Sequence, residues 1–110
     1  MSVTNEKRQV QHASDATFGK LVLESEVPVL VDFYADWCGP CQRLAPILEE
    51  LAAEIPNARV VKVNVDHSPS LASEYGIESI PSLKVFKRGR VTDELVGLAN
   101  KSQLRAMLVR

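Results

Sequence analysis

The spacing of apolar residues changes several times along the chain, and each spacing predicts one kind of secondary structure. The segment 29–34 is almost continuously apolar, which is typical of a strand covered on both faces. The segment 58–65 instead carries valines at alternate positions. Two later apolar runs flank a turn at Arg88 and Gly89 and predict an antiparallel hairpin. The expected strands are therefore 9–12, 29–34, 58–65, 82–87 and 90–96.

Apolar residues three or four positions apart predict helices between these strands. The longest such pattern follows residue 41, carries glutamates on its other face and ends at Pro56. Pro46 lies inside this helix, where a proline kinks the chain or removes a hydrogen bond. The inward positions of the helix are Leu44, Ile47, Leu48, Leu51 and Ile55. The other expected helices are 15–23 after an N-cap at Ser14, a short one from Ser68 to about Tyr75, and a last one capped by Asn100.

The order of these elements is β-α-β-α-β-α-β-β-α, which predicts an α/β fold with a mixed sheet and helices on both faces. A chain of 110 residues with 45% hydrophobic content is suited to a single core. We therefore expect one domain over residues 9–110, preceded by a polar tail at 1–8.

Charge and hydropathy narrow the possible partners and the compartment. The formal net charge of −1 gives no field of one sign that would attract nucleic acid or a membrane surface. The longest apolar run is far shorter than the roughly 20 residues that a membrane helix needs. The first residues show no apolar stretch behind their charges, so no signal peptide is predicted. The expected location is the reducing cytoplasm, where a close cysteine pair is more often catalytic or metal-binding than structural.

Both cysteines lie in one motif, Trp37-Cys38-Gly39-Pro40-Cys41, between a predicted strand and a predicted helix. A structural disulfide across so short a loop would remove little entropy from the unfolded chain. A zinc site needs four ligands, and the other candidates, His12 and His67, lack the paired spacing of zinc modules. The pattern therefore favours a dithiol that cycles with its disulfide.

The motif also predicts which sulfur does what. If Cys38 lies at the first turn of the helix, free backbone N–H groups and the helix dipole favour its thiolate. We expect Cys38 to be exposed and to attack a substrate disulfide. Cys41, one turn later and more buried, would then attack Cys38 and release the reduced substrate. Pro40 suits a first helical turn because it has no N–H to satisfy.

The motif and several other segments together resemble the thioredoxin family, over roughly residues 10–108. The resemblance implies the thioredoxin fold, with a central mixed sheet of about five strands flanked by four helices. It implies protein-disulfide reductase activity without a bound cofactor, with electrons from NADPH delivered through thioredoxin reductase. The matching segments are Asp32-Phe33, Trp37 to Cys41, Ala45-Pro46, Val63 to Asp66, Tyr75 to Ile77, Ile80-Pro81, Phe86-Lys87 and Val96-Gly97.

The same resemblance assigns roles to residues that spacing alone leaves open. Asp32 would lie below Cys41 and assist proton transfer from its thiol, although a buried aspartate is as often only a structural group. Burial would raise the pKa of Asp32, which suits a base acting near neutral pH. Lys62 matches the lysine partner of that aspartate, or else is a solvated strand residue. The bond before Pro81 would be cis and would lie against the disulfide; otherwise Pro81 simply begins a strand.

An apolar docking rim around Cys38 is also implied. Trp37 would be exposed in this rim, the alternative being a core aromatic residue. The cis bond would turn the backbone of Ile80 outward to pair with an extended substrate. The rim residues are Trp37, Ile77, Ile80, Gly97 and Leu98.

The sequence departs from the family pattern near this rim. Tyr34 stands where many bacterial members carry tryptophan, and Gln42 stands where lysine or arginine is frequent, a charge that Arg43 can supply instead. Glu78, Ser79 and Leu98 also differ from common family residues. These changes concern the choice of partners more than the chemistry.

Two further functions stay open at the level of sequence. One is a disulfide oxidase or isomerase, against which Gly39 and Pro40 argue, since oxidising relatives commonly carry histidine there. The other is a thioredoxin-fold binding subunit. A monomer whose substrates are disulfide-containing proteins is the leading expectation.

Overall fold

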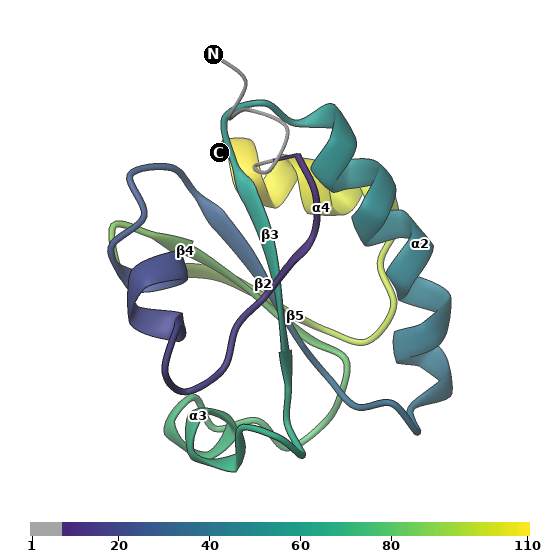
Figure 1. Ribbon diagram of the computed structural model, residues 1–110. Coiled ribbons are helices and arrows are strands. Elements are labelled where there is room, and N and C mark those ends of the chain that lie inside the picture. Colours follow the sequence, from purple (N-terminus) through teal and green to yellow (C-terminus); the bar gives the residue numbers. More distant parts are fainter. Residues whose placement is uncertain (1–7) are drawn as a thin grey trace.

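The computed structural model of the chain describes residues 8–110, and their strands form one twisted sheet (Figure 1). The strand order is β1-β3-β2-β4-β5, with β2 at the centre. The strands are β1 (Gln11–His12), β2 (Val29–Tyr34), β3 (Arg59–Asn64), β4 (Ser82–Lys87) and β5 (Arg90–Val96). The predicted polar tail, 1–8, lies outside the described residues except for Arg8.

The sheet is mixed, as predicted. Strands β1, β3 and β2 run parallel to one another. Strand β4 is antiparallel to β2, and β5 is antiparallel to β4 across a hairpin turn. The turn residues Arg88 and Gly89 both have positive φ values, 52° and 81°, as such a tight reversal requires. Because β2 and β3 are parallel, their carboxyl ends meet at one edge of the sheet.

Helices cover both faces of the sheet (Figure 1). They are η1 (Gly19–Leu23), α2 (Gly39–Glu54), α3 (Pro69–Glu74) and α4 (Lys101–Val109). Along β2, Leu30 packs with the leucines of α2 and α4, whereas Val31 and Phe33 pack with η1 and α3. This alternation puts Asp32 on the same face as Leu30, under α2. No helix in residues 8–110 has the length and apolar character needed to cross a membrane.

The predicted helix 15–23 is regular over only five residues, and these form a π-helix instead of an α-helix. Its regular part is η1, where the backbone N–H of Glu24 donates to the carbonyl of Gly19, five residues earlier (2.9 Å). Before it, the Ser14 hydroxyl accepts from the N–H of Ala16 (3.2 Å), and the Thr17 hydroxyl accepts from the N–H of Ser14 (2.9 Å). These bonds have the pattern of an N-cap at Ser14, as predicted, and the N–H of Phe18 donates to the Ser14 carbonyl (2.9 Å) in the first turn. The departure from α-helical bonding lies in η1.

The other element boundaries differ from the predictions by one or two residues. The expected edge strand 9–12 pairs only over Gln11–His12, and the expected strand 58–65 pairs over Arg59–Asn64. Pro46 does not end α2, which runs for 16 residues around it. The side chain of Pro46 is exposed, so water can reach the carbonyl that has lost its helical donor.

Candidate active site

The two cysteines lie where β2 ends and α2 begins. Cys38 is the N-cap of α2, with extended backbone, and its Sγ accepts a hydrogen bond from the N–H of Cys41 (3.2 Å). The two sulfurs are joined in a disulfide, and the Cα atoms are 5.2 Å apart. One helical turn thus brings both sulfurs within bonding distance and directs the N–H of Cys41 at Cys38.

The exposure of Cys38 differs from the expectation. In the disulfide form Cys38 is only 5% exposed, against 2% for Cys41. Cys38 is the more exposed of the two cysteines, as expected, but the prediction of an exposed Cys38 is wrong for the disulfide form. The physical reason is the packing of the disulfide against Tyr34, Val65 and Ile80, which border it.

The segment before β4 faces the disulfide from the other side. The bond between Ile80 and Pro81 is cis, as the resemblance implies. The Ile80 carbonyl oxygen lies 3.9 Å from Cys38 Sγ. A disulfide sulfur carries no proton, so this is a contact here, and it becomes a possible hydrogen bond when Cys38 is a thiol. The N–H of Gly97, at φ 101°, donates to the Pro81 carbonyl (2.8 Å) and ties the end of β5 to this segment.

Asp32 is fully buried behind the cysteines. Burial raises the pKa of Asp32 to about 7, and the positive charge of Lys62 offsets part of that rise. Neither carboxylate oxygen accepts a hydrogen bond from the described residues. A buried carboxyl with a pKa near neutrality and no fixed partner can gain or lose a proton at physiological pH.

Lys62 is beside Asp32 in the strand register but does not bind it directly. The two residues are paired between β2 and β3, on the same face of the sheet. The Lys62 ammonium lies instead over the ring of Tyr34, 4.2 Å from the ring centroid. Lys62 therefore acts on Asp32 through its charge at a distance, while its direct contact is with an aromatic ring.

The surface next to the disulfide is apolar and open. Trp37 is 71% exposed, which excludes the alternative of a core aromatic residue. Its Nε1–H donates to the carboxylate of Asp66 (2.9 Å), at the end of β3. Leu98 is 50% exposed, Ile77 and Ile80 are half-buried, and Pro81 is buried.

Two residues near the disulfide received no role from the sequence, Asp66 and Tyr34. Asp66 fixes the indole of Trp37, and Tyr34 holds the ammonium of Lys62. A signal existed for Asp66, because polar residues just after parallel strands gather at the same sheet edge. No sequence signal pairs Tyr34 with Lys62, since their contact depends on strand register.

The histidines considered for zinc lie together but apart from the cysteines. His12 and His67 line one hollow of about 310 Å³ with Tyr34 and Lys62. Within residues 8–110, no three histidine, cysteine, aspartate or glutamate side chains are grouped as a metal site.

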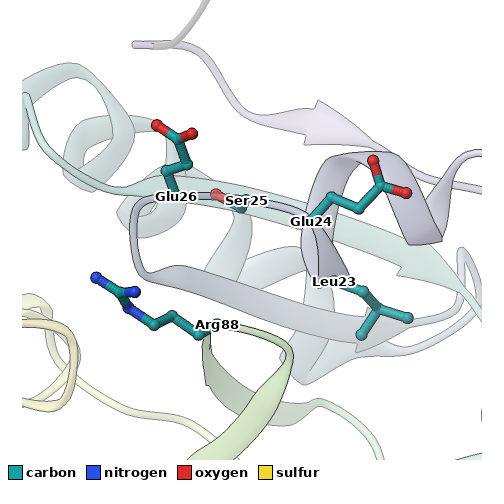
Figure 2. Close-up of a pocket in the computed structure, with 5 residues that line it drawn as sticks. All are labelled: Leu23, Glu24, Ser25, Glu26 and Arg88. Carbon is teal, nitrogen blue, oxygen red and sulfur yellow. The ribbon is translucent and has the colours of Figure 1, made fainter.

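Another hollow lies at the end of the sheet opposite the disulfide, next to the start of β2, and Figure 2 shows the residues that line it. It measures about 510 Å³ and is formed by the segment before β2 and the hairpin turn. Its lining residues are Leu23, Glu24, Ser25, Glu26 and Arg88. None of them contributes to the site described above.

A cysteine pair that forms a disulfide at the start of a helix, beside a cis-proline and above a titratable buried carboxyl, defines a thiol–disulfide oxidoreductase. The family model described as Thioredoxin matches residues 9–110. The chain therefore belongs to the thioredoxin family, and its activity is the reduction of protein disulfides.

Individual relatives agree with this assignment. The chain is 53% identical over 92 residues to Thioredoxin 1 of Synechococcus elongatus, covering 83% of this chain and 86% of that one. It is 48% identical over 94 residues to Thioredoxin of Rickettsia felis, covering 84% and 90%. A mutant thioredoxin from Halobacterium salinarum NRC-1 matches in structure with a TM-score of 0.85 and 38% identity, over 93% of this chain and 89% of that one. The predicted fold is thereby confirmed.

Proposed function

We propose that Cys38 is the attacking sulfur of this disulfide reductase and that Cys41 is the resolving one. The observation that carries this assignment is the hydrogen bond from the N–H of Cys41 to Cys38 Sγ at the N-cap of α2. The same N–H, together with the helix dipole, would stabilise a thiolate on Cys38 after reduction. A lowered thiol pKa is general in Cys-x-x-Cys motifs, thioredoxins included.

The exchange transfers two electrons from the protein to its substrate. The Cys38 thiolate attacks one sulfur of the substrate disulfide, forms a mixed disulfide and releases the other sulfur as a thiolate. Cys41 then loses its proton and attacks Cys38 Sγ. The mixed disulfide breaks, the second substrate thiolate leaves, and the Cys38–Cys41 disulfide forms.

Asp32 is proposed to accept the proton of Cys41 in the second step. Its carboxyl is buried under α2 and has a pKa of about 7, raised by burial. At neutral pH a substantial fraction is therefore ionised and able to act as a base. Lys62 supports this role by favouring the carboxylate electrostatically.

The docking rim is proposed to hold the substrate next to Cys38. Trp37, Ile77, Ile80, Gly97 and Leu98 would supply apolar contact area around the sulfur. The exposed indole of Trp37, fixed by Asp66, supports this proposal. The cis bond at Pro81 leaves the backbone of Ile80 beside the sulfur, where an extended segment of substrate can pair with it.

The remaining proposals concern the cycle as a whole. Thioredoxin reductase would return two electrons from NADPH to the disulfide, and no cofactor would be bound to the chain itself. The chain would act as a monomer in the cytoplasm, as one domain over residues 9–110. Gly39 and Pro40 between the cysteines support reduction as the working direction, rather than oxidation or isomerisation.

A matched pair of cysteine variants tests the assignment of the two sulfurs. Cys38→Ser should abolish the reduction of insulin disulfides by a dithiol reductant, and it should form no mixed disulfide. Cys41→Ser should also lose turnover but should accumulate a mixed disulfide, which non-reducing electrophoresis detects. If Cys38→Ser were the variant that trapped substrate, the two roles would be reversed. Equal rates for Cys38→Ser and the unmodified protein would contradict the proposal.

A further inference from the structure

A lysine ammonium beside a buried carboxylate would be expected to bind it, yet Lys62 is bound elsewhere. The Lys62 ammonium lies 4.2 Å from the centroid of the Tyr34 ring. Both oxygens of Asp32 are left without a hydrogen-bond donor from residues 8–110. The three side chains share one face of the sheet, because Asp32 and Tyr34 are two residues apart on β2 and Lys62 is paired with Asp32 on β3.

We propose that Tyr34 is a positioning residue, whose ring holds the Lys62 ammonium away from the Asp32 carboxylate and thereby sets the pH range in which Asp32 can accept a proton from Cys41. This inference rests on the proposed role of Asp32. It gives a specific function to Tyr34, a residue outside the cysteine motif.

The ring and the carboxylate compete for the same cation. Neighbouring strands lie about 4.8 Å apart, and a lysine side chain is long enough to reach either group. The face of an aromatic ring attracts an ammonium, most strongly where water is partly excluded. Lys62 is half-buried, so both attractions act on it. When the ring is lost, the remaining strong attraction is the unpartnered carboxylate of Asp32.

The positive charge of Lys62 lowers the pKa of Asp32, whereas burial raises it by a larger amount. A lysine in direct contact with the carboxylate would lower that pKa further, because the attraction between unlike charges grows as their distance falls. The ring of Tyr34 therefore keeps the pKa of Asp32 higher than an ion pair would.

The other titratable groups around this cluster come from β1, from α2 and from the segment between β3 and α3. On β1, His12 is paired with Lys62, and its ring meets that of Tyr34 edge-on, 6.4 Å between centroids. His67, between β3 and α3, lines the same hollow as Lys62. From α2, the only titratable side chain buried toward the sheet is Cys41. On β4, the partner of Asp32 is the apolar Leu83.

Direct titration of Asp32 tests the inference. The protein is kept in its disulfide form, in which neither cysteine titrates, and the labelled carboxyl carbon of Asp32 is followed by NMR against pH. Tyr34→Leu should lower the pKa of Asp32 by about one unit, the usual scale for a charge that comes into contact. Tyr34→Phe keeps the ring and should leave the pKa unchanged. Tyr34→Val serves in place of the leucine variant if that variant does not fold.

The same comparison in the variant Lys62→Met shows whether Tyr34 affects the pKa of Asp32 through Lys62. Lys62→Met should raise the pKa of Asp32, and adding Tyr34→Leu to it should then change nothing. An unchanged or raised pKa in Tyr34→Leu alone would overturn the inference. So would an equal fall with and without Lys62, because the ring would then act on the carboxyl by itself.

The proposed role of Asp32 is judged by a different measurement. The rate of mixed-disulfide resolution should follow the shifted pKa in its pH profile. If the pKa moves but that profile does not, Tyr34 still positions Lys62, and the proton-transfer role of Asp32 is the part that fails.

Discussion

Asp32 is the residue whose surroundings change its chemistry most. It interrupts an apolar strand, lies fully buried and has a pKa of about 7 because burial disfavours its charged form. The same shift affects stability. An unfolded aspartate has a pKa near 3.9. The folded state therefore binds this proton more tightly than the unfolded state, and its stability falls as pH rises from about 4 to above 7.

The variant Asp32→Asn should remove this pH dependence. Relative to the unmodified protein, its free energy of unfolding should increase by about 2–3 kcal/mol between pH 5 and pH 8, as the two pKa values require. Urea unfolding at both pH values measures this change. The comparison between pH values cancels the constant cost of burying an amide. A constant difference between the two proteins across this range would contradict the burial-raised pKa.

At the scale of elements, helices α2 and α4 cover the face of the sheet under which Asp32 lies. Helix α2 begins at Gly39, directly after its N-cap Cys38, and buries its apolar face against the sheet. Helix α4 has nine residues, too few to be stable alone, and it packs beside α2 on the same face. Its start is fixed by a capping box: the Asn100 side chain accepts from the N–H of Gln103 (2.8 Å), and the Gln103 side chain accepts from the N–H of Asn100 (2.9 Å).

Loss of the cap on α4 should lower stability without affecting the chemistry. Asn100→Ala should decrease the free energy of unfolding by about 1 kcal/mol, the usual cost of an N-cap. Ser102→Ala, two residues later on the exposed side of the same turn, is the matched control and should have little effect. Chemical denaturation measures both. Similar losses in the two variants would show that the box contributes nothing specific.

At the scale of the whole molecule, the two ends of the sheet differ in character. The disulfide, the cis-proline and the exposed Trp37 lie at the carboxyl end of β2. The opposite end carries the hairpin turn, the hollow lined by Leu23 and Arg88, and an exposed Val109 beside Pro28. Both ends have exposed apolar side chains, so exposure alone does not identify the docking surface.

Two substitutions that each introduce a charge test which end of the sheet docks the substrate. Leu98 is 50% exposed and Val109 is 72% exposed. Leu98→Asp should raise the KM for insulin about tenfold, since it places a charge where apolar substrate surface would be buried. Val109→Asp, at the remote end, should leave the KM unchanged. Steady-state kinetics with a dithiol reductant measure both values, and equal effects would exclude Leu98 from the docking rim.

The parts of the structure that could be predicted are those with local causes. The hairpin β4–β5 follows from two apolar runs around a turn at Arg88 and Gly89, and α4 follows from its cap and spacing. The segment 15–23 was only partly predictable: the cap at Ser14 follows from the sequence, but nothing in the spacing indicates the π-helical bonding of Gly19–Leu23. The cis bond before Pro81 followed only from family resemblance, since no local pattern distinguishes the two isomers.

The sequence by itself determined the order of elements, the redox pair Cys38 and Cys41, and a carboxyl buried in the strand before them. These depend on neighbours along the chain: residue spacing, turn residues and the apolar run around Asp32. Only the tertiary structure decided that Lys62 lies on Tyr34, that Asp66 holds Trp37, and that Cys38 is covered in the disulfide form. Such contacts arise from strand register and from packing between segments far apart in sequence, where small differences in position decide which groups meet.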